Sequence, residues 1–133
     1  MESQFRRALI DWLRADATLS QMVNTIEEEG PVATSAPAIA IVASASADWS
    51  TKTATGREVR LALELVDRSD ASETTAQIAA RIEQRMATLP ADQGDYRVVV
   101  TQFLRSRAER RKRSTRAVLL EYRFKLIATE NHP

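Results

Sequence analysis

The densest group of charged side chains in the sequence lies between Arg105 and Arg116. This segment holds seven basic residues and one acidic residue, although the whole chain of 133 residues has a formal net charge of only +1. Such a cluster can bind phosphates or an acidic protein surface. The run holds no aromatic side chain that could stack on a base, so contacts with nucleic acid would be with backbone charge. A flexible, solvated loop explains the same composition equally well. The basic residues are Arg105, Arg107, Arg110, Arg111, Lys112, Arg113 and Arg116.

Two acidic groups could be imagined as cation sites, but a structural role fits each of them better. The consecutive side chains of Glu27–Glu29 diverge in any regular backbone, so we interpret them as part of a solvated loop. Asp67, Asp70 and Glu73 form a better-spaced acidic set, but a capping role explains two of them. The segment Asp70–Glu73 resembles a capping box, in which polar side chains bind the free N–H groups at the start of a helix. We therefore predict a helix start there and no metal site.

The sequence offers no set of side chains that could form a catalytic centre. The single histidine, His132, is the penultimate residue, where the chain is expected to fray, and there is no cysteine. The glycines at 30, 56 and 94 stand alone, so no glycine-rich loop is available to hold a nucleotide phosphate. We predict that the protein is not an enzyme and binds no cofactor.

A tryptophan in a polar segment is the other candidate for a functional residue. Trp49 is followed by Thr51 and Lys52, and a large apolar ring in such a loop is costly unless something covers it. Packing onto the protein's own core is the commoner outcome, and anchoring an interface is the alternative. Trp12 lies at a helical core position and receives no functional role.

Hydrophobic periodicity predicts that an α+β fold positions these residues. Phe5, Leu9 and Leu13 recur at helical spacing, whereas apolar residues alternate with charged ones from Glu58 to Leu65, as expected for an antiparallel sheet covered on one side. The predicted order is α-β-β-α-β-β, a four-stranded, mainly antiparallel sheet with helices packed on one face. The predicted segments are a helix over 1–14, a helical turn over 16–23, a loop over 24–37, strands over 38–45 and 58–65 with a loop over 46–56 between them, a helix from about 70 to 89, and strands over 96–105 and 116–129.

Length and composition suit a single domain over residues 1–133, with residues 130–133 expected to fray. Residues 1–14 lack the apolar core of a signal peptide, and no segment reaches the length of a membrane span. The absence of cysteine fits a reducing compartment. We therefore expect a cytoplasmic protein with no membrane partner.

The string DWSTKTATGREVRLALELVDRSD, which begins at Asp48, is followed by a predicted helix, a strand, a basic segment and a strand. Over residues 1–129 this arrangement resembles the tail terminator, or tail completion, proteins of long-tailed bacteriophages and gene transfer agents. The most distinctive pieces are Trp49–Lys52, Gly56–Glu58 and the late segment Leu120–Phe124.

The resemblance implies a structural particle protein rather than an enzyme. Its copies would form a homo-oligomeric ring, typically of six, that caps the tail tube, ends tube growth and joins the tail to the head connector or stopper protein. The protein would then pass from the cytoplasm into the particle, at the head–tail junction. We expect the basic segment to face either the ring lumen, through which DNA passes, or the neighbouring subunit, and Trp49, Thr51 and Lys52 to contact the tube or a subunit. The alternative is a monomeric nucleic-acid-binding module that uses the basic hairpin 105–116.

Overall fold

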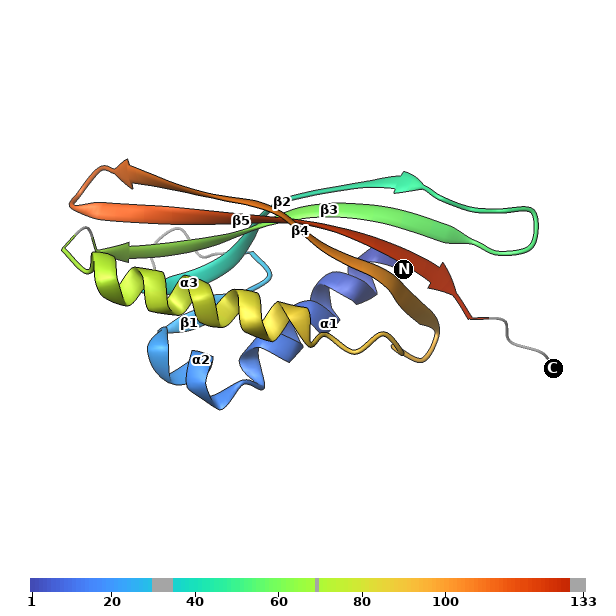
Figure 1. Ribbon diagram of the computed structural model, residues 1–133, viewed down its shortest axis with the longest axis horizontal. Coiled ribbons are helices and arrows are strands. Elements are labelled where there is room, and N and C mark those ends of the chain that lie inside the picture. The colour runs from blue at the N-terminus through green and yellow to red at the C-terminus, as the bar shows by residue number, and fades with distance from the viewer. Residues whose placement is uncertain (30–34, 69, 130–133) are drawn as a thin grey trace.

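The chain forms two layers, a five-stranded sheet and three helices that all lie on one face of it (Figure 1). The structure is a computed structural model, and it describes residues 1–29, 35–68 and 70–129. Gly30 and residues 130–133, including His132, therefore lie outside the described residues. The elements are α1 (Glu2–Arg14), α2 (Ala17–Met22), β1 (Thr25–Glu27), β2 (Ala38–Asp48), β3 (Gly56–Arg68), α3 (Ser72–Ala87), β4 (Tyr96–Arg111) and β5 (Thr115–Ala128).

The strands follow the order β1-β2-β3-β5-β4 across the sheet. The pairs β2–β3, β3–β5 and β5–β4 are antiparallel, and only β1 is parallel to its neighbour β2. The predicted α+β class, the mainly antiparallel sheet and the single helical layer are confirmed. The strand count of four was wrong, because β1 lies within the segment 24–37 that was predicted as a loop. Three residues are too few to show an alternating pattern, so β1 forms only because β2 lies beside it.

The core lies between the helices and the alternating residues of β3 and β5. Val59 of β3 pairs with Phe124 of β5, and both side chains are fully buried. Phe5 of α1 packs edge-on against Phe124, with the ring centroids 4.6 Å apart. The opposite face of the sheet carries no helix, and it is this face that bears the charged residues of the alternation.

Two contacts hold the helices to one another. Asp16 caps α2, since its side chain accepts a hydrogen bond from the Leu19 backbone N–H, and the same carboxylate binds Arg81 of α3. Trp12 and Arg85 exchange two bonds: the indole N–H donates to the Arg85 carbonyl, and the guanidinium donates to the Trp12 carbonyl while lying 3.3 Å from the ring centroid. The helical layer is therefore fixed by side chains as well as by apolar burial.

The predicted capping box at Asp70–Glu73 was wrong. The cap residue of α3 is Ala71, which makes no side-chain bond to the helix. Asp67, at the end of β3, instead accepts a hydrogen bond from the Thr75 hydroxyl at 2.7 Å, so it ties the first turn of α3 to the sheet. The side chain that anchors the start of α3 thus lies outside the local motif and makes a tertiary contact, which the motif alone could not reveal.

Three of the strands, β2, β3 and β4, are longer than the sequence predicts. β2 continues to Asp48 instead of ending at residue 45, β3 extends to Arg68, and α3 ends at Ala87 rather than at residue 89. The largest difference concerns the basic segment 105–116, which was predicted as a loop. Most of it is strand, because β4 continues to Arg111 and β5 begins at Thr115.

Candidate interaction surfaces

The basic segment forms the end of a long hairpin rather than a loop. β4 and β5 pair as far as Arg111 and Thr115, which leaves only Lys112–Ser114 in the turn. Arg113 and Ser114 both have positive φ angles, 61° and 55°, a conformation that usually favours glycine or asparagine. The Thr115 hydroxyl donates to the Lys112 carbonyl at 2.7 Å and closes the turn. The structure thus presents basic side chains on an ordered tip.

Carboxylates of the neighbouring strands neutralise two of the seven basic residues. Arg105 donates to Glu121 of β5, and this bond lowers the pKa of Glu121. Arg111 binds Glu64 of β3 and Glu109 of its own strand, each at 2.7 Å, and its bond to Glu109 lowers the pKa of that carboxyl. These ion pairs lie on the helix-free face, and they explain why the segment pairs as strand despite its charge.

The other five basic residues of the segment form no such ion pair within the described residues. Arg116 is half-buried opposite Asp67 in the β3–β5 register, and its buried Nε has no hydrogen-bond partner among the described residues. The remaining four are exposed and form no ion pair within the part of the chain that the structure describes. They are Arg107, Arg110, Lys112 and Arg113. These four side chains are therefore the ones available to an outside partner.

The second candidate surface is the loop between β2 and β3, residues 49–55. It is ordered by its own polar groups: the Ser50 hydroxyl accepts from the Gly56 N–H at 3.0 Å, and the Thr51 hydroxyl accepts from the Ala54 N–H at 3.1 Å. Trp49 is half-buried, with the Lys125 ammonium 4.7 Å from its ring centroid. Thr51 and Lys52 are exposed. The ring therefore packs against its own sheet, while the loop tip points outward.

These two surfaces lie at opposite ends of the molecule (Figure 1). In the β3–β5 register Arg68 pairs with Thr115, next to the basic turn, whereas Gly56 pairs with Ile127, next to the Trp49 loop. At about 3.3 Å per residue along β3, the two ends are separated by about 40 Å. The basic side chains and Trp49, Thr51 and Lys52 therefore do not form one site.

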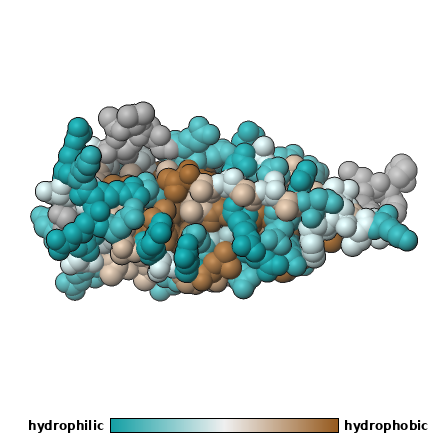
Figure 2. Space-filling view, turned by 90° about the horizontal axis from the view of Figure 1, so that it is seen from above, coloured by the Kyte–Doolittle hydropathy of each residue, from teal (hydrophilic) through white to brown (hydrophobic). Residues whose placement is uncertain are grey.

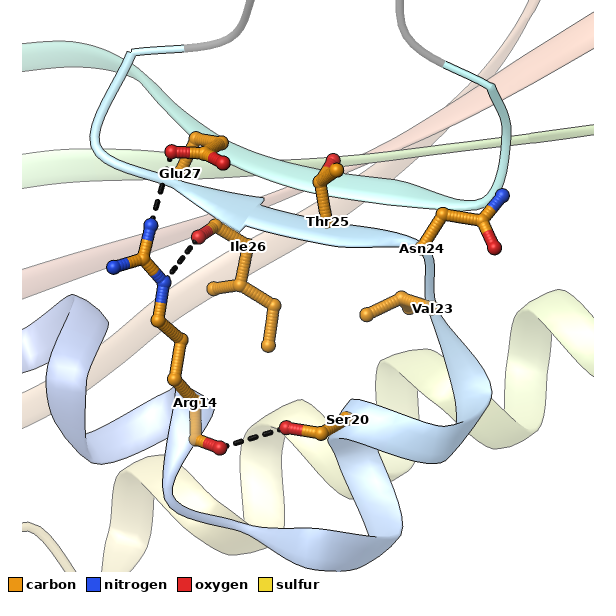
Figure 3. A pocket seen from close by; sticks show the side chains of 7 residues that line it. All are labelled: Arg14, Ser20, Val23, Asn24, Thr25, Ile26 and Glu27. Atoms are coloured by element: carbon orange, nitrogen blue, oxygen red, sulfur yellow. Dashed lines mark hydrogen bonds and ion pairs between the residues drawn. The ribbon is translucent and has the colours of Figure 1, made fainter.

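A shallow hollow of about 270 Å³ lies between the α1–α2 connection and β1 (Figure 3). Arg14 crosses it, donating to the Ile26 carbonyl at 2.6 Å and to Glu27 at 2.9 Å, while the Ser20 hydroxyl donates to the Arg14 carbonyl. Glu28 binds Arg6 at 3.2 Å. These two acidic residues therefore pair with arginines of α1. Within residues 1–29, 35–68 and 70–129, no three acidic, histidine or cysteine side chains converge as metal ligands.

A comparison with known protein families shows which proteins share this sequence pattern. The family model of the tail completion protein gp17 matches residues 7–126. The chain belongs to this family. Tail completion proteins of this family are structural components of virions, which agrees with the resemblance seen in the sequence.

The fold of this tail completion protein is also found in a solved particle structure. It is similar to a chain in the structure of the virion of a native gene transfer agent particle, with a TM-score of 0.76 and 24% sequence identity over 92% of this chain and 94% of that one. No curated protein sequence matches it. None of the helices in the described ranges combines the length and apolar character needed to cross a bilayer.

Sequence reasoning located the basic residues of this tail completion protein but not their partners. Glu64 and Glu121 are separated from Arg111 and Arg105 along the chain, and the sheet register alone brings them together. The only sequence feature that pointed to these two glutamates as partners was their position among the charged residues of the alternating strands.

Proposed function

We propose that the protein forms a ring, with six copies as the expected number, that caps the tail tube, ends its growth and joins the tail to the head connector or stopper protein. The observation that carries this proposal is the presence of two ordered, protruding hairpins at opposite ends of one sheet in a chain of the tail completion family. A joint between two assemblies needs two separate contact surfaces on each subunit. The same fold occurs in a chain of a gene transfer agent virion, which suits a structural role in such a particle.

Each end of the sheet suits a different contact. The Trp49 loop offers Thr51 and Lys52 on a framework stiffened by its own hydrogen bonds, which suits binding to the tube or to a subunit. The tip at Lys112–Arg113 carries unpaired positive charge, which suits the lumen, where DNA passes, or an acidic neighbouring subunit. The protein would assemble in the bacterial cytoplasm and remain at the head–tail junction of the particle.

Removing the protein from cells that produce the particles tests this function. Without a cap, tubes should continue to grow, so electron micrographs should show tails of extended and irregular length and heads without tails. Supplying the protein from a plasmid should restore tails of uniform length. Tails of normal length joined to heads in its absence would contradict the proposal.

The role of the basic tip is tested with a pair of matched variants. Arg113→Ser removes one charge from the turn, whereas Arg7→Ser removes one exposed charge from α1. We expect the first variant to lower the yield of tailed particles and the second to leave it unchanged. Equal yields from both would show that the tip charge has no part in assembly.

The four unpaired basic residues also favour one alternative, a monomeric nucleic-acid-binding module. That function predicts binding to duplex DNA that weakens steeply as salt increases, because each phosphate contact releases a counterion. Sedimentation of the purified protein with and without a short duplex separates the two. A monomer that binds DNA tightly would favour the module, and a ring-sized species without DNA would favour the terminator.

A further inference from the structure

Both long edges of the sheet carry strand segments without a partner strand in the described chain. β1 pairs with β2 only at residues 38–40, so the outer edge of β2 is unpaired from residue 41 to Asp48. At the other side, β4 pairs with β5 alone, and its residues 101–111 are all exposed. Unpaired N–H and C=O groups along an edge favour pairing with another chain.

Apolar exposure is concentrated on the same two strands. Four large apolar side chains are exposed within the described residues: Val42 (46%), Val99 (43%), Phe103 (41%) and Leu104 (40%). Val42 belongs to β2, and the other three belong to β4. The view from above the helix-free face shows apolar surface amid hydrophilic surface near the middle of the molecule, while the end with the basic turn is hydrophilic (Figure 2). Both edges therefore carry apolar side chains that a neighbour would cover.

The two edges also match in level and direction. Through the pairings of β2, β3, β5 and β4, Ser46 lies level with Val59, Phe124 and Thr101. These four strands alternate strictly in direction, so β2 and β4 run antiparallel to each other. When a second copy is placed beside the first in the same orientation, its β4 is antiparallel to the first copy's β2. The two strands can therefore pair along the free residues 41–48, whereas β1 occupies the edge at residues 38–40. This arrangement is possible because four strands, an even number, alternate in direction, so the two outer strands run in opposite directions.

We propose that the partner of the β2 edge is the β4 edge of a second copy of this chain, and that repetition of this contact closes the ring. The inference rests on the proposed ring, to which it adds the interface. The contact is head-to-tail, so each copy uses both edges and the end copies meet when the rotation closes. Within the exposed part of β2, residues Ala43 to Ala47 are all small, which allows a neighbouring backbone to approach closely.

The structure indicates which backbone groups of β2 would pair. The Trp49 N–H donates to the Gly56 carbonyl at 3.0 Å, so Trp49 faces β3. Because successive residues of an antiparallel strand point their N–H groups to opposite sides, Ala45 and Ala47 also face β3, while Ser44 and Ser46 point theirs away from it. Proline at residue 46 would thus remove a donor from the free edge and leave the β2–β3 ladder intact.

Cysteine cross-linking in assembled particles tests the interface, and the cysteine-free sequence makes the result specific. Ser46 and Thr101 are exposed, lie at the same level and point to the same face. We expect Ser46→Cys with Thr101→Cys, treated with a short bismaleimide, to give a ladder of cross-linked subunits on a denaturing gel. Each single variant, as the matched control, should give no species larger than a dimer.

Two outcomes separate the interface from the function. If the double variant is incorporated into particles that have tails of normal length but yields no ladder, the edge pairing is overturned and the proposed function stands. If the wild-type protein is absent from particles, both are overturned.

Proline substitution provides the second measurement. We expect Ser46→Pro to keep the far-ultraviolet circular dichroism of the wild type and to be excluded from particles, whereas Ser46→Ala, which keeps the N–H, should be incorporated normally. Incorporation of folded Ser46→Pro at the wild-type level would overturn the pairing. If Ser46→Pro does not fold, the cross-linking result decides.

Discussion

The carboxylate of Asp16 joins two helices, and replacing it with asparagine should measure how much that link contributes to stability. The side chain is only 6% exposed. It accepts the Leu19 N–H at 3.0 Å and the Arg81 Nε–H at 2.7 Å, and the second arm of the guanidinium also binds it. Asparagine caps helices about as well as aspartate. Asp16→Asn therefore removes mainly the charge that pairs with Arg81.

The size of the effect follows from the pKa of Asp16. The hydrogen bond from Arg81 is the main cause that lowers this pKa from its ordinary value of 3.8 to about 2, against the opposing effect of burial. A shift of that size corresponds to about 2 kcal/mol of stability at neutral pH. Because the Arg81 side chain is 32% exposed, solvent screening reduces the expected loss to about 1–2 kcal/mol. For a chain of this length, that is a fall in melting temperature of about 4–8 °C.

Thermal and urea unfolding of Asp16→Asn, Arg81→Gln and the double variant would give the coupling energy between the two side chains. Since folding lowers the pKa, the contribution is present above the unfolded value near 3.8 and is lost as the pH falls toward about 2. The stability difference between wild type and Asp16→Asn should shrink over that range. A coupling below about 0.3 kcal/mol, or a difference that stays constant down to the folded pKa, would refute the reasoning.

Three further substitutions test other features of the fold. The buried Tyr122 hydroxyl has no hydrogen-bond partner within the described residues, so Tyr122→Phe should leave the unfolding free energy in urea unchanged or raise it by up to about 1 kcal/mol, and a clear loss would contradict this. A Cβ at residue 56 would lie 2.6 Å from the Trp49 carbonyl oxygen, so Gly56→Ala should cost about 1–3 kcal/mol and shift tryptophan fluorescence, whereas wild-type stability would show that the backbone yields freely. Arg113 has a φ of 61°, so Arg113→Gly should raise the melting temperature through a gain of up to about 1 kcal/mol, and a lower one would show that the side chain stabilises the turn.

The sequence predicts the parts of the fold that depend on long, regular patterns. The helical spacing of Phe5, Leu9 and Leu13 and the alternation that begins at Val59 suffice for α1 and β3, because each pattern covers several turns or residue pairs. β1 could not be predicted, since three residues without a pattern become a strand only beside β2. The false capping box at Asp70 has a similar origin, because the group that secures the start of α3, Asp67, reaches it across a loop.

The candidate surfaces were predictable in composition but not in geometry. The count of arginines correctly marks the hairpin, yet a segment with seven positive charges does not resemble a strand until Glu64 and Glu121 are placed beside it. That placement depends on the register of β3, β5 and β4, which the sequence does not state. The separation of Trp49 from the basic turn, at opposite ends of the sheet, is likewise a property of topology alone.

The pairing of arginines with carboxylates along the hairpin has a consequence for how homologous sequences should diverge. Loss of Arg105 would leave Glu121 without its cation, and loss of Arg111 would do the same to Glu64, so these positions should change in concert. Arg107, Arg110, Lys112 and Arg113 have no such internal partner within the described residues. Their rate of substitution should depend on the molecule that they contact outside the subunit. The same hairpin thus holds two groups of basic residues under different constraints: the fold constrains Arg105 and Arg111, and outside contacts constrain the other four.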